Sequence, residues 1–233
     1  YYEIYKIRRY GFHGISHKYV SERAAQFMGQ NPGRVKTIVC HLGNGASICA
    51  VKYGRVVDNS MGFTPLEGLV MGTRCGDVDP GALEYLAKKE KLSLSEIMQI
   101  LNKESGVLGI SRNYSSDFRE LKDAEIKYND MAALAREIFA YKVAKYIGSY
   151  AAAMNGVDNI VFTAGVGEND SDIRTEICDY LEFLGITIDE VKNREQGEAF
   201  KISDGSSKIN VLVIKTNEEL EIAREAAAVA EPI

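Results

Sequence analysis

The chain has 233 residues, 45% of them apolar and 26% charged, and this composition excludes a disordered or membrane-spanning chain. Its formal charge of -5 is spread along the sequence, with no basic stripe long enough to follow a nucleic-acid backbone. Four widely spaced cysteines without C-x-x-C spacing favour reduced thiols. We therefore expect a cytoplasmic globular protein with neither nucleic-acid nor membrane partners.

The first part of the chain is predicted to form one helix and an antiparallel meander. Short apolar runs alternate with turns that carry glycine and asparagine, which is the pattern of strands joined by tight turns. The helix is expected at residues 18–28, and the strands are expected at 37–41, 47–51 and 56–61.

Capping signals predict where the next two helices begin. Asp79 followed by Pro80 is a typical helix start, because proline is well tolerated at the first helical position. Ser93 and Glu96 form a capping box, in which each side chain can bond the backbone N–H of the other residue. The helices are expected at 81–89 and from the capping box to about residue 103.

The C-terminal part is predicted to contain a long helix followed by two strand–helix units. Apolar residues recur at helical spacing through the long helix, and two short apolar runs predict buried strands. The second run leads into another capping box, from Thr216 to Glu219. These elements are expected at 130–155, 160–163, 170–184, 210–214 and from the second capping box to about 230.

This order of elements predicts an α/β fold. The chain is predicted to contain three meander strands, then helices, and then a strand followed by a helix twice. This order of elements is found in one half of the actin, sugar-kinase and heat-shock ATPase superfamily. The ribonuclease-H-like domains of that superfamily place a mixed five-stranded sheet between helices. We expect residues 1–233 to form one such domain, and Tyr1 in place of an initiating Met suggests a fragment or a processed piece.

The first candidate site motif is RRYGFHG, followed by a second histidine. Glycines on both sides of Phe12 and His13 free the backbone there, so the imidazole of His13 could be held toward a cleft. A histidine that only makes a structural hydrogen bond is the competing interpretation. His17 lies four residues after His13, as in some metal pairs, but no third ligand is nearby in the sequence.

Two glycine-rich stretches could bind phosphate. The HLGNGAS stretch, residues 41–47, joins two strands through a Gly-Asn-Gly turn whose backbone N–H groups can form an anion nest. Hairpin turns use the same residues without any ligand. The FTAGVGEN stretch, residues 162–169, runs through two glycines into a helix start that favours a nucleotide phosphate. It lacks the third glycine of a Rossmann fingerprint.

Two charged residues are further candidates. Arg74 lies in a stretch rich in glycine and proline and can direct two donors at a carboxylate or phosphoryl group. It could instead pair with Asp77 or Asp79 and brace its own loop. Glu218 could hold a metal ion because the capping box occupies Glu219, although acidic residues in a first helical turn usually interact only with the helix dipole.

Taken in order, these stretches resemble the acetate kinase (acetokinase) family from Arg8 almost to the C-terminus. The resemblance implies two ribonuclease-H-like domains that face each other across a cleft and reversibly convert acetate and Mg-ATP to acetyl phosphate and ADP by in-line phosphoryl transfer. Only the C-terminal domain of the family is recognisable, so the chain alone is expected to be inactive. The motifs that carry the resemblance are RRYGFHG, HLGNGAS, MGFTPLEGLVMGTRCGDVDP, SSDFREL, FTAGVGEN and TNEEL.

The resemblance also implies roles for individual residues. His13 and Arg74 would be catalytic, Phe12 and Pro65 would line the pocket for the acetate methyl group, and Glu218 would help to hold Mg²⁺. The family is typically a homodimer that forms its contact through this half. The implied nucleotide contacts are His41, Leu42, Gly43, Asn44, Gly45, Asp117, Phe118, Arg119, Gly165, Val166, Gly167, Glu168 and Asn169.

Other functions remain open at this point. A propionate or butyrate kinase would share most of this chemistry, and the long block around Arg74 favours acetate or propionate over butyrate. A relative that uses pyrophosphate in place of ATP is a further alternative. From a different class, the chain could be a nucleotide-binding and dimerisation module without catalytic activity.

Overall fold

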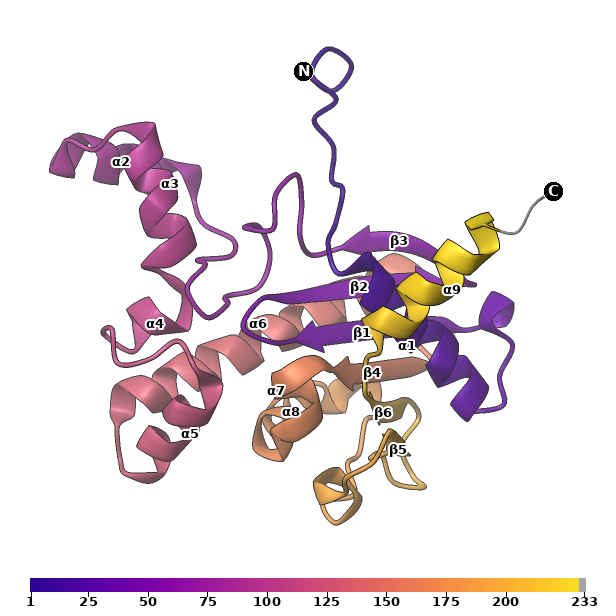
Figure 1. Cartoon of the computed structure of the whole chain (residues 1–233). Coiled ribbons are helices and arrows are strands. Elements are labelled where there is room, and N and C mark those ends of the chain that lie inside the picture. The colour runs from indigo at the N-terminus through magenta and orange to yellow at the C-terminus, as the bar shows by residue number, and fades with distance from the viewer. Residues whose placement is uncertain (231–233) are drawn as a thin grey trace.

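The computed structural model describes residues 1–230 and shows one mixed sheet of six strands in the order β3-β2-β1-β4-β6-β5 (Figure 1). β1, β4 and β6 run parallel to one another, and β2, β3 and β5 join them through antiparallel pairs. The strands are β1 (Lys36–Leu42), β2 (Ala46–Lys52), β3 (Arg55–Asn59), β4 (Asn159–Thr163), β5 (Ala199–Lys201) and β6 (Asn210–Ile214).

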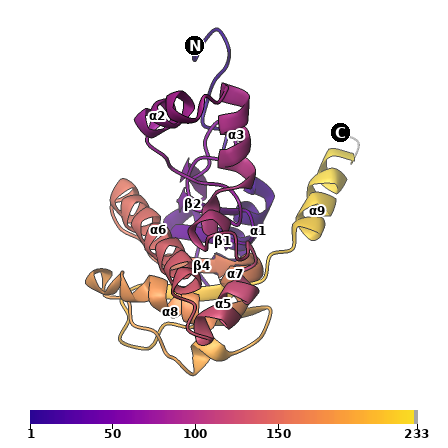
Figure 2. The same ribbon diagram turned by 90° about the vertical axis from the view of Figure 1, so that its left-hand side faces the viewer.

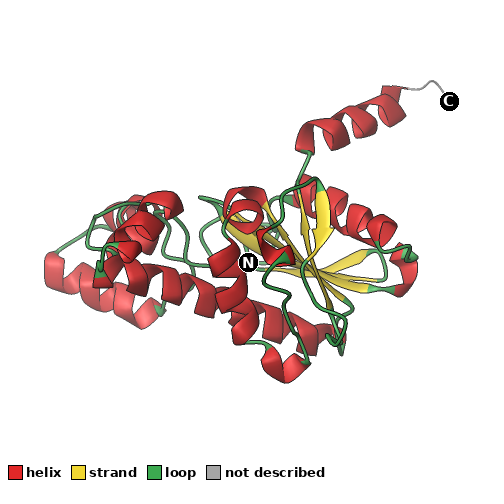
Figure 3. Ribbon diagram, turned by 90° about the horizontal axis from the view of Figure 1, so that it is seen from below, coloured by secondary structure: helices red, strands yellow, loops and turns green. Residues whose placement is uncertain are grey.

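Helices cover both faces of the sheet (Figure 3). α1 packs Val20 and Ala24 against apolar side chains of the three parallel strands on one face. On the other face, α6 contributes more residues to the larger core than any other helix, and α8 packs beside it. The α-helices are α1 (Gly14–Phe27), α2 (Pro80–Glu90), α3 (Leu94–Lys103), α4 (Gly106–Ile110), α5 (Phe118–Ile126), α6 (Asp130–Met154), α7 (Ala164–Asn169), α8 (Ser171–Asp179) and α9 (Glu218–Ala230).

Two helical segments extend from this layered body. The α2–α3 pair stands away from the sheet, and α9 leaves the carboxyl end of β6 to lie beside α1 (Figures 1 and 2). Lys18 of α1 forms ion pairs of 2.8 Å with the buried Glu221 and 2.7 Å with Glu225 of α9. None of the helices that the structure describes is long and apolar enough to span a bilayer.

The strands were largely predictable, and the expected mixed α/β sheet is confirmed. All five strands expected from the sequence are present, with ends that differ by at most two residues. The count of five was wrong because β5 was not predicted. This strand has three residues and pairs only with β6, so its sequence carries little periodic signal.

Several helix boundaries also differ from the prediction. The long helix and the Ser93–Glu96 capping box are confirmed. α1 begins at Gly14 rather than at residue 18, and the helix expected at 170–184 ends at Asp179, before a separate 3₁₀ turn. The short helices α4, α5 and α7 were not predicted.

The prediction of a second capping box, from Thr216 to Glu219, was wrong. The Leu220 N–H donates to Asn217 Oδ1 at 2.9 Å, so Asn217 caps α9. The Thr216 hydroxyl instead lies 2.8 Å from the hydroxyl of Ser16 in α1. Glu219 therefore does not have the capping role that the sequence suggested.

A buried ion pair joins α6 to the start of α8. Arg136, whose side chain is 3% exposed, donates to Asp170 Oδ2 at 2.7 Å and to Glu125 Oε2 at 2.5 Å. Burial raises the pKa of Asp170, but the Arg136 hydrogen bond and charge outweigh it and hold this pKa below its ordinary value. The pair thus stabilises the fold only while Asp170 is ionised.

We predict that Asp170→Asn lowers the free energy of unfolding by about 3 kcal/mol at pH 7, because the buried Arg136 charge loses its best partner. Folding lowers the pKa of Asp170. Its contribution to stability is therefore present at pH values above the pKa of the unfolded state, about 3.9, and is lost as the pH falls through the pKa of the folded state. Urea unfolding at pH 7 and pH 3 measures both effects.

The matched control is Asp172→Asn, which removes an exposed carboxylate that pairs with Lys122 at 2.8 Å. We expect a loss below about 1 kcal/mol for this variant because exposed ion pairs contribute little. Equal losses in the two variants would contradict the role given to the buried pair.

Candidate active site

The candidate site lies where the three parallel strands end. The carboxyl ends of parallel strands meet at one edge of a sheet, which is the usual place for a ligand in open α/β folds. β1 leads into the Gly43-Asn44-Gly45 turn, β4 leads directly into α7, and β6 leads through a short loop into α9. The structure therefore brings three of the predicted motifs to one edge.

All three histidines of the chain cluster beside this edge. The rings of His13 and His41 stack with centroids 4.0 Å apart and an interplanar angle of 17°. Ser47 Oγ lies 2.9 Å from His13 Nδ1 and 2.7 Å from His17 Nε2. Ser16 Oγ lies 2.8 Å from His41 Nδ1.

Burial disfavours the charged form of each of these imidazoles. It lowers the pKa of His13, with a further lowering by the nearby Arg74 charge. It also lowers the pKa of His41 to about 3 and holds the pKa of His17 well below its ordinary value. Within residues 1–230 no group of three or more His, Cys, Asp or Glu side chains is arranged to hold a metal ion.

His13 has an unusual backbone conformation. It is the N-cap of α1 and has φ 59° and ψ 26°, in the left-handed region that non-glycine residues rarely adopt. Such strain persists only where surrounding contacts hold it, and it is concentrated at functional sites. The flanking glycines permit this local turn, as the sequence suggested.

Arg74 lies beside His13. Its guanidinium donates to the backbone carbonyl of Pro65 at 2.9 Å, and it has no carboxylate partner in the part of the chain that the structure describes. A Cβ atom on Gly45 would lie 3.6 Å from both terminal nitrogens of Arg74 and 3.8 Å from His13 Cε1. Arg74 and His13 therefore converge over the glycine turn.

The alternative that Arg74 braces its loop against an aspartate was wrong. Asp77 accepts hydrogen bonds from Gly68 N–H at 3.0 Å and from the Tyr146 hydroxyl at 2.9 Å. Asp79 caps α2 by accepting from Gly81 N–H at 2.9 Å. Both carboxylates are thus used elsewhere, and the Arg74 charge is left without a neutralising partner among the described residues.

A cavity of about 570 Å³ adjoins the glycine turn and gathers three predicted stretches from distant parts of the sequence. Its walls come from the turn after β1, the start of α5 and the two ends of α7. This volume is in the range of small-ligand pockets. The predicted nucleotide residues that line it are Gly43, Asn44, Asp117, Phe118, Arg119, Gly165, Val166 and Asn169.

The other five predicted nucleotide residues do not line this cavity. Leu42 and Gly167 are buried in the core, His41 belongs to the histidine cluster, and Gly45 faces Arg74. Glu168 has an internal role that the sequence did not suggest. Its Oε1 accepts from Ala164 N–H at 2.8 Å, from Thr216 N–H at 3.1 Å and from the Thr163 hydroxyl at 3.2 Å.

Sequence reasoning missed three charged residues near the cavity. Lys122 and Asp170 line it and lie 3.3 Å apart. Arg174 is fully buried behind α7, where it donates to the carbonyl oxygens of Gly167 at 2.9 Å and Glu168 at 3.0 Å. Burial lowers the pKa of Arg174 to about 10. None of the three stands in a glycine-rich motif, so only their spatial position identifies them.

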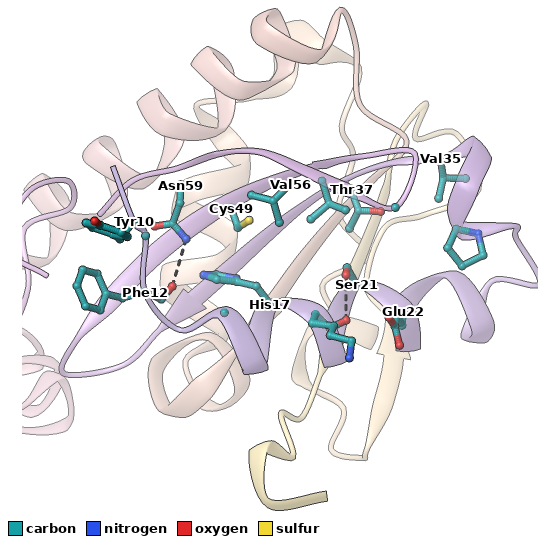
Figure 4. A pocket seen from close by; sticks show the side chains of 16 residues that line it. Tyr10, Phe12, His17, Ser21, Glu22, Val35, Thr37, Cys49, Val56 and Asn59 are labelled. Atoms are coloured by element: carbon teal, nitrogen blue, oxygen red, sulfur yellow. Dashed lines mark hydrogen bonds between the residues drawn. The ribbon is translucent and has the colours of Figure 1, made fainter. Parts of the chain in front are cut away.

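A second cavity, of about 740 Å³, lies between α1 and the strands of the meander (Figure 4). Phe12 and His17 line it, and Asn59 donates to the Phe12 carbonyl at 3.2 Å. Pro65 is not among its lining residues, so the structure does not show Phe12 and Pro65 in one pocket. The role of these two residues toward acetate stays a prediction.

Glu218 is the first residue of α9 and is half-buried. The loop before it is held by two bonds of Thr216, one to Glu168 and one to Ser16. Glu218 thus stands at the same sheet edge as the glycine turn and α7.

Comparison with known proteins identifies the family. The acetokinase family model matches residues 1–224. The acetate kinase of Thermotoga maritima is 57% identical over 100% of this chain and 58% of its own length. The crystal structure of Porphyromonas gingivalis acetate kinase matches with a TM-score of 0.95 and 47% identity over 99% of this chain and 58% of its own.

A propionate kinase structure from Francisella tularensis matches with a TM-score of 0.89 and 47% identity, over 97% of this chain and 57% of that one. The chain thus spans a little over half the length of these relatives. Their likeness also confirms the expected ribonuclease-H-like, sugar-kinase type of fold. On sequence and structure together, the chain belongs to the acetokinase family.

Proposed function

We propose that this chain supplies the nucleotide-binding half of an acetate kinase, which reversibly transfers the terminal phosphoryl group of ATP to acetate. One observation carries the proposal. Gly43 and Asn44 line the 570 Å³ cavity, and the next residue, Gly45, faces His13 and Arg74. A nucleotide in the cavity would extend its phosphates over this turn toward the two side chains.

The chemistry fits in-line phosphoryl transfer. This reaction needs little covalent chemistry from the protein and depends on positioned donors and positive charge around the migrating group. Arg74 offers a cation without a carboxylate partner in the described chain, and its paired donors match phosphoryl or carboxylate oxygens. His13 adds a neutral donor close to the same point, since a Cβ on Gly45 would also lie 3.8 Å from His13 Cε1.

The adenosine would occupy the cavity between α5 and α7. Asp117 caps α5 by accepting from Arg119 N–H at 2.8 Å, and its carboxylate also holds the Arg119 guanidinium at 3.1 and 2.6 Å, so the cap fixes where this helix begins beside the cavity. Gly165 has open space around it, which lets a ribose or base approach the backbone. These contacts favour ATP over pyrophosphate as the phosphoryl donor.

Glu218 fits a magnesium ion that arrives with the nucleotide. Mg²⁺ commonly takes only one or two protein carboxylates together with substrate phosphates. Within the described residues Glu218 makes no ion pair, which leaves its carboxylate available. The ion would neutralise charge on the phosphates, while Thr216, Ser16 and Glu168 hold the loop that positions Glu218.

Acetate is the proposed acceptor, and Phe12 and Pro65 are proposed to face its methyl group. Propionate is the second candidate, because a propionate kinase is among the similar structures.

We also propose a cytoplasmic homodimer. Exposed apolar side chains on the protruding helices, such as Tyr85 and Leu94, support such a contact.

We predict that the chain binds ADP but converts acetate and ATP to acetyl phosphate at a negligible rate, because it spans a little over half the length of the acetate kinases it matches and supplies only part of the donors and positive charge that phosphoryl transfer needs. Calorimetry measures ADP binding, and a hydroxamate assay measures acetyl phosphate formation.

Gly72→Ala should weaken ADP binding about tenfold, since its new Cβ would lie 1.7 Å from Asn44 Oδ1. Gly148→Ala is the control, with open space at that position.

A second prediction separates two neighbouring carboxylates of α9 in a full-length acetate kinase that carries this half. Glu218→Gln should raise the Mg²⁺ concentration needed for half-maximal rate about tenfold or more. Glu219→Gln should leave it unchanged because Glu219 is exposed. A magnesium titration of kcat measures this, and equal curves for the two variants would exclude a metal role for Glu218.

A third prediction concerns Arg74. In the same full-length protein, Arg74→Lys should keep the ATP affinity but lose about 2 to 4 kcal/mol of transition-state stabilisation, because an ammonium cannot reproduce the paired donors. Measuring kcat and the melting temperature on one preparation tests this. A lowered melting temperature with normal kcat would instead make Arg74 a structural residue that holds the Pro65 carbonyl.

A further inference from the structure

Ser47 connects His13 to a second, more deeply buried histidine. Its hydroxyl lies 2.9 Å from His13 Nδ1 and 2.7 Å from His17 Nε2, and it has no third partner within residues 1–230. A hydroxyl has a single hydrogen and can accept as well as donate. If Ser47 accepted from both rings, its own hydrogen would be buried without an acceptor, because no third partner lies within hydrogen-bond distance in residues 1–230. Ser47 therefore donates to one ring and accepts from the other, which links the protonation sites of the two histidines.

Two arrangements satisfy this link. In the first, the Ser47 hydroxyl donates to His13 Nδ1 and accepts from His17 Nε2–H, so both neutral rings carry their hydrogen on Nε2. In the second, His13 Nδ1–H donates to Ser47, which donates to His17 Nε2, and both rings carry their hydrogen on Nδ1. The first leaves a donor on the outer edge of His13, and the second leaves an acceptor there.

The environment of His17 distinguishes the two arrangements. His17 is 1% exposed, and its Nδ1 has no hydrogen-bond partner in the described part of the chain. The first arrangement leaves a lone pair at this atom, whereas the second leaves an N–H group without an acceptor. Buried N–H groups without acceptors are the rarer defect in proteins. His17 therefore favours the first arrangement.

The other face of His13 does not oppose this assignment. His41 stacks on the His13 ring and bonds Ser16, so it makes no hydrogen bond to His13. Arg74 lies near His13 as a cation, which disfavours a second positive charge on the imidazole. His13 is then a neutral ring whose only available donor is Nε2–H.

We propose that Ser47 and His17 are positioning residues that fix the Nε2–H tautomer of His13, so that a neutral imidazole donates to the transferring phosphoryl group. This inference rests on the proposed role of His13 in phosphoryl transfer. Ser47 and His17 would not touch substrate. They act by setting which nitrogen of His13 carries the hydrogen, as orienting residues do for catalytic histidines in other enzymes.

The direct test is the tautomeric state of the three histidines, measured by long-range ¹H–¹⁵N correlation on histidine-labelled chain at pH 7. We expect His13 and His17 to be neutral and to carry hydrogen on Nε2. His13 as the Nδ1–H tautomer, or as imidazolium, would overturn the proposal. This measurement needs neither substrate nor turnover, so a failure of the proposed kinase activity cannot be mistaken for a failure of the inference.

Ser47→Ala tests the cause. The spectrum of this variant should show His13 as a mixture of tautomers, whereas Ser47→Thr, which keeps the hydroxyl, should retain Nε2–H. An unchanged His13 tautomer in Ser47→Ala would overturn the role of Ser47. In a full-length acetate kinase Ser47→Ala should lower kcat about 10²-fold, the usual loss for one preorganised donor, while ATP affinity changes less than about twofold. A normal kcat together with a mixed tautomer would overturn the catalytic part of the proposal.

The matched control is Ser60→Ala. Ser60 is also fully buried, and its hydroxyl accepts from Ile48 N–H at 2.9 Å without touching a histidine. This variant removes a buried hydroxyl of the same size and should lower the melting temperature without changing any tautomer. If it altered the His13 signal as Ser47→Ala does, the effect would be general loosening of the sheet, and the proposal would fail.

Discussion

The Glu168 carboxylate joins the elements on which the rest of the site depends. One of its oxygens accepts hydrogen bonds from the end of β4 and the start of α7, and also from Thr216 after β6. Ala164 has φ 65° in this turn, a conformation that a non-glycine residue keeps only under tertiary support. Arg174 binds carbonyls at the other end of α7. The cavity wall and the loop before Glu218 are therefore fixed together.

Those features of the fold that arise from local chemistry could be predicted from the sequence. The Ser93–Glu96 capping box and the Asp79 cap need only neighbouring residues, and both form as expected. The 25-residue α6 has an asparagine cap at one end and a left-handed Asn155 at the other. The strands β1, β2 and β4 are apolar enough that burial decides their conformation.

Features that depend on long-range contacts could not be predicted in this way. Thr216 has the right spacing for a capping box, but its N–H, which Glu219 would need, donates to Glu168, and its hydroxyl donates to Ser16, 200 residues earlier in the chain. Asp77 has the right spacing to pair with Arg74, but Tyr146 of α6 takes its carboxylate. Glu168 lies within the FTAGVGEN motif, yet its carboxylate binds backbone N–H groups and does not line the cavity, because the ends of β4 and β6 converge on it. In each case a partner far away in sequence takes part in fixing the side chain.

The glycine turn after β1 explains why one short motif can serve two regions of the site. Gly43 and Asn44 face the cavity, while Gly45 faces His13 and Arg74. Asn44 in turn packs against Gly72, whose missing side chain leaves room for its amide. A Cβ at Gly45 would meet His13 and Arg74 at ordinary contact distances, so an alanine there could be accommodated without a clash. It would, however, fill the space beside the imidazole and guanidinium in which the proposed mechanism places the transferring phosphoryl group. Glycine at this position is therefore required by the proposed chemistry more than by the fold.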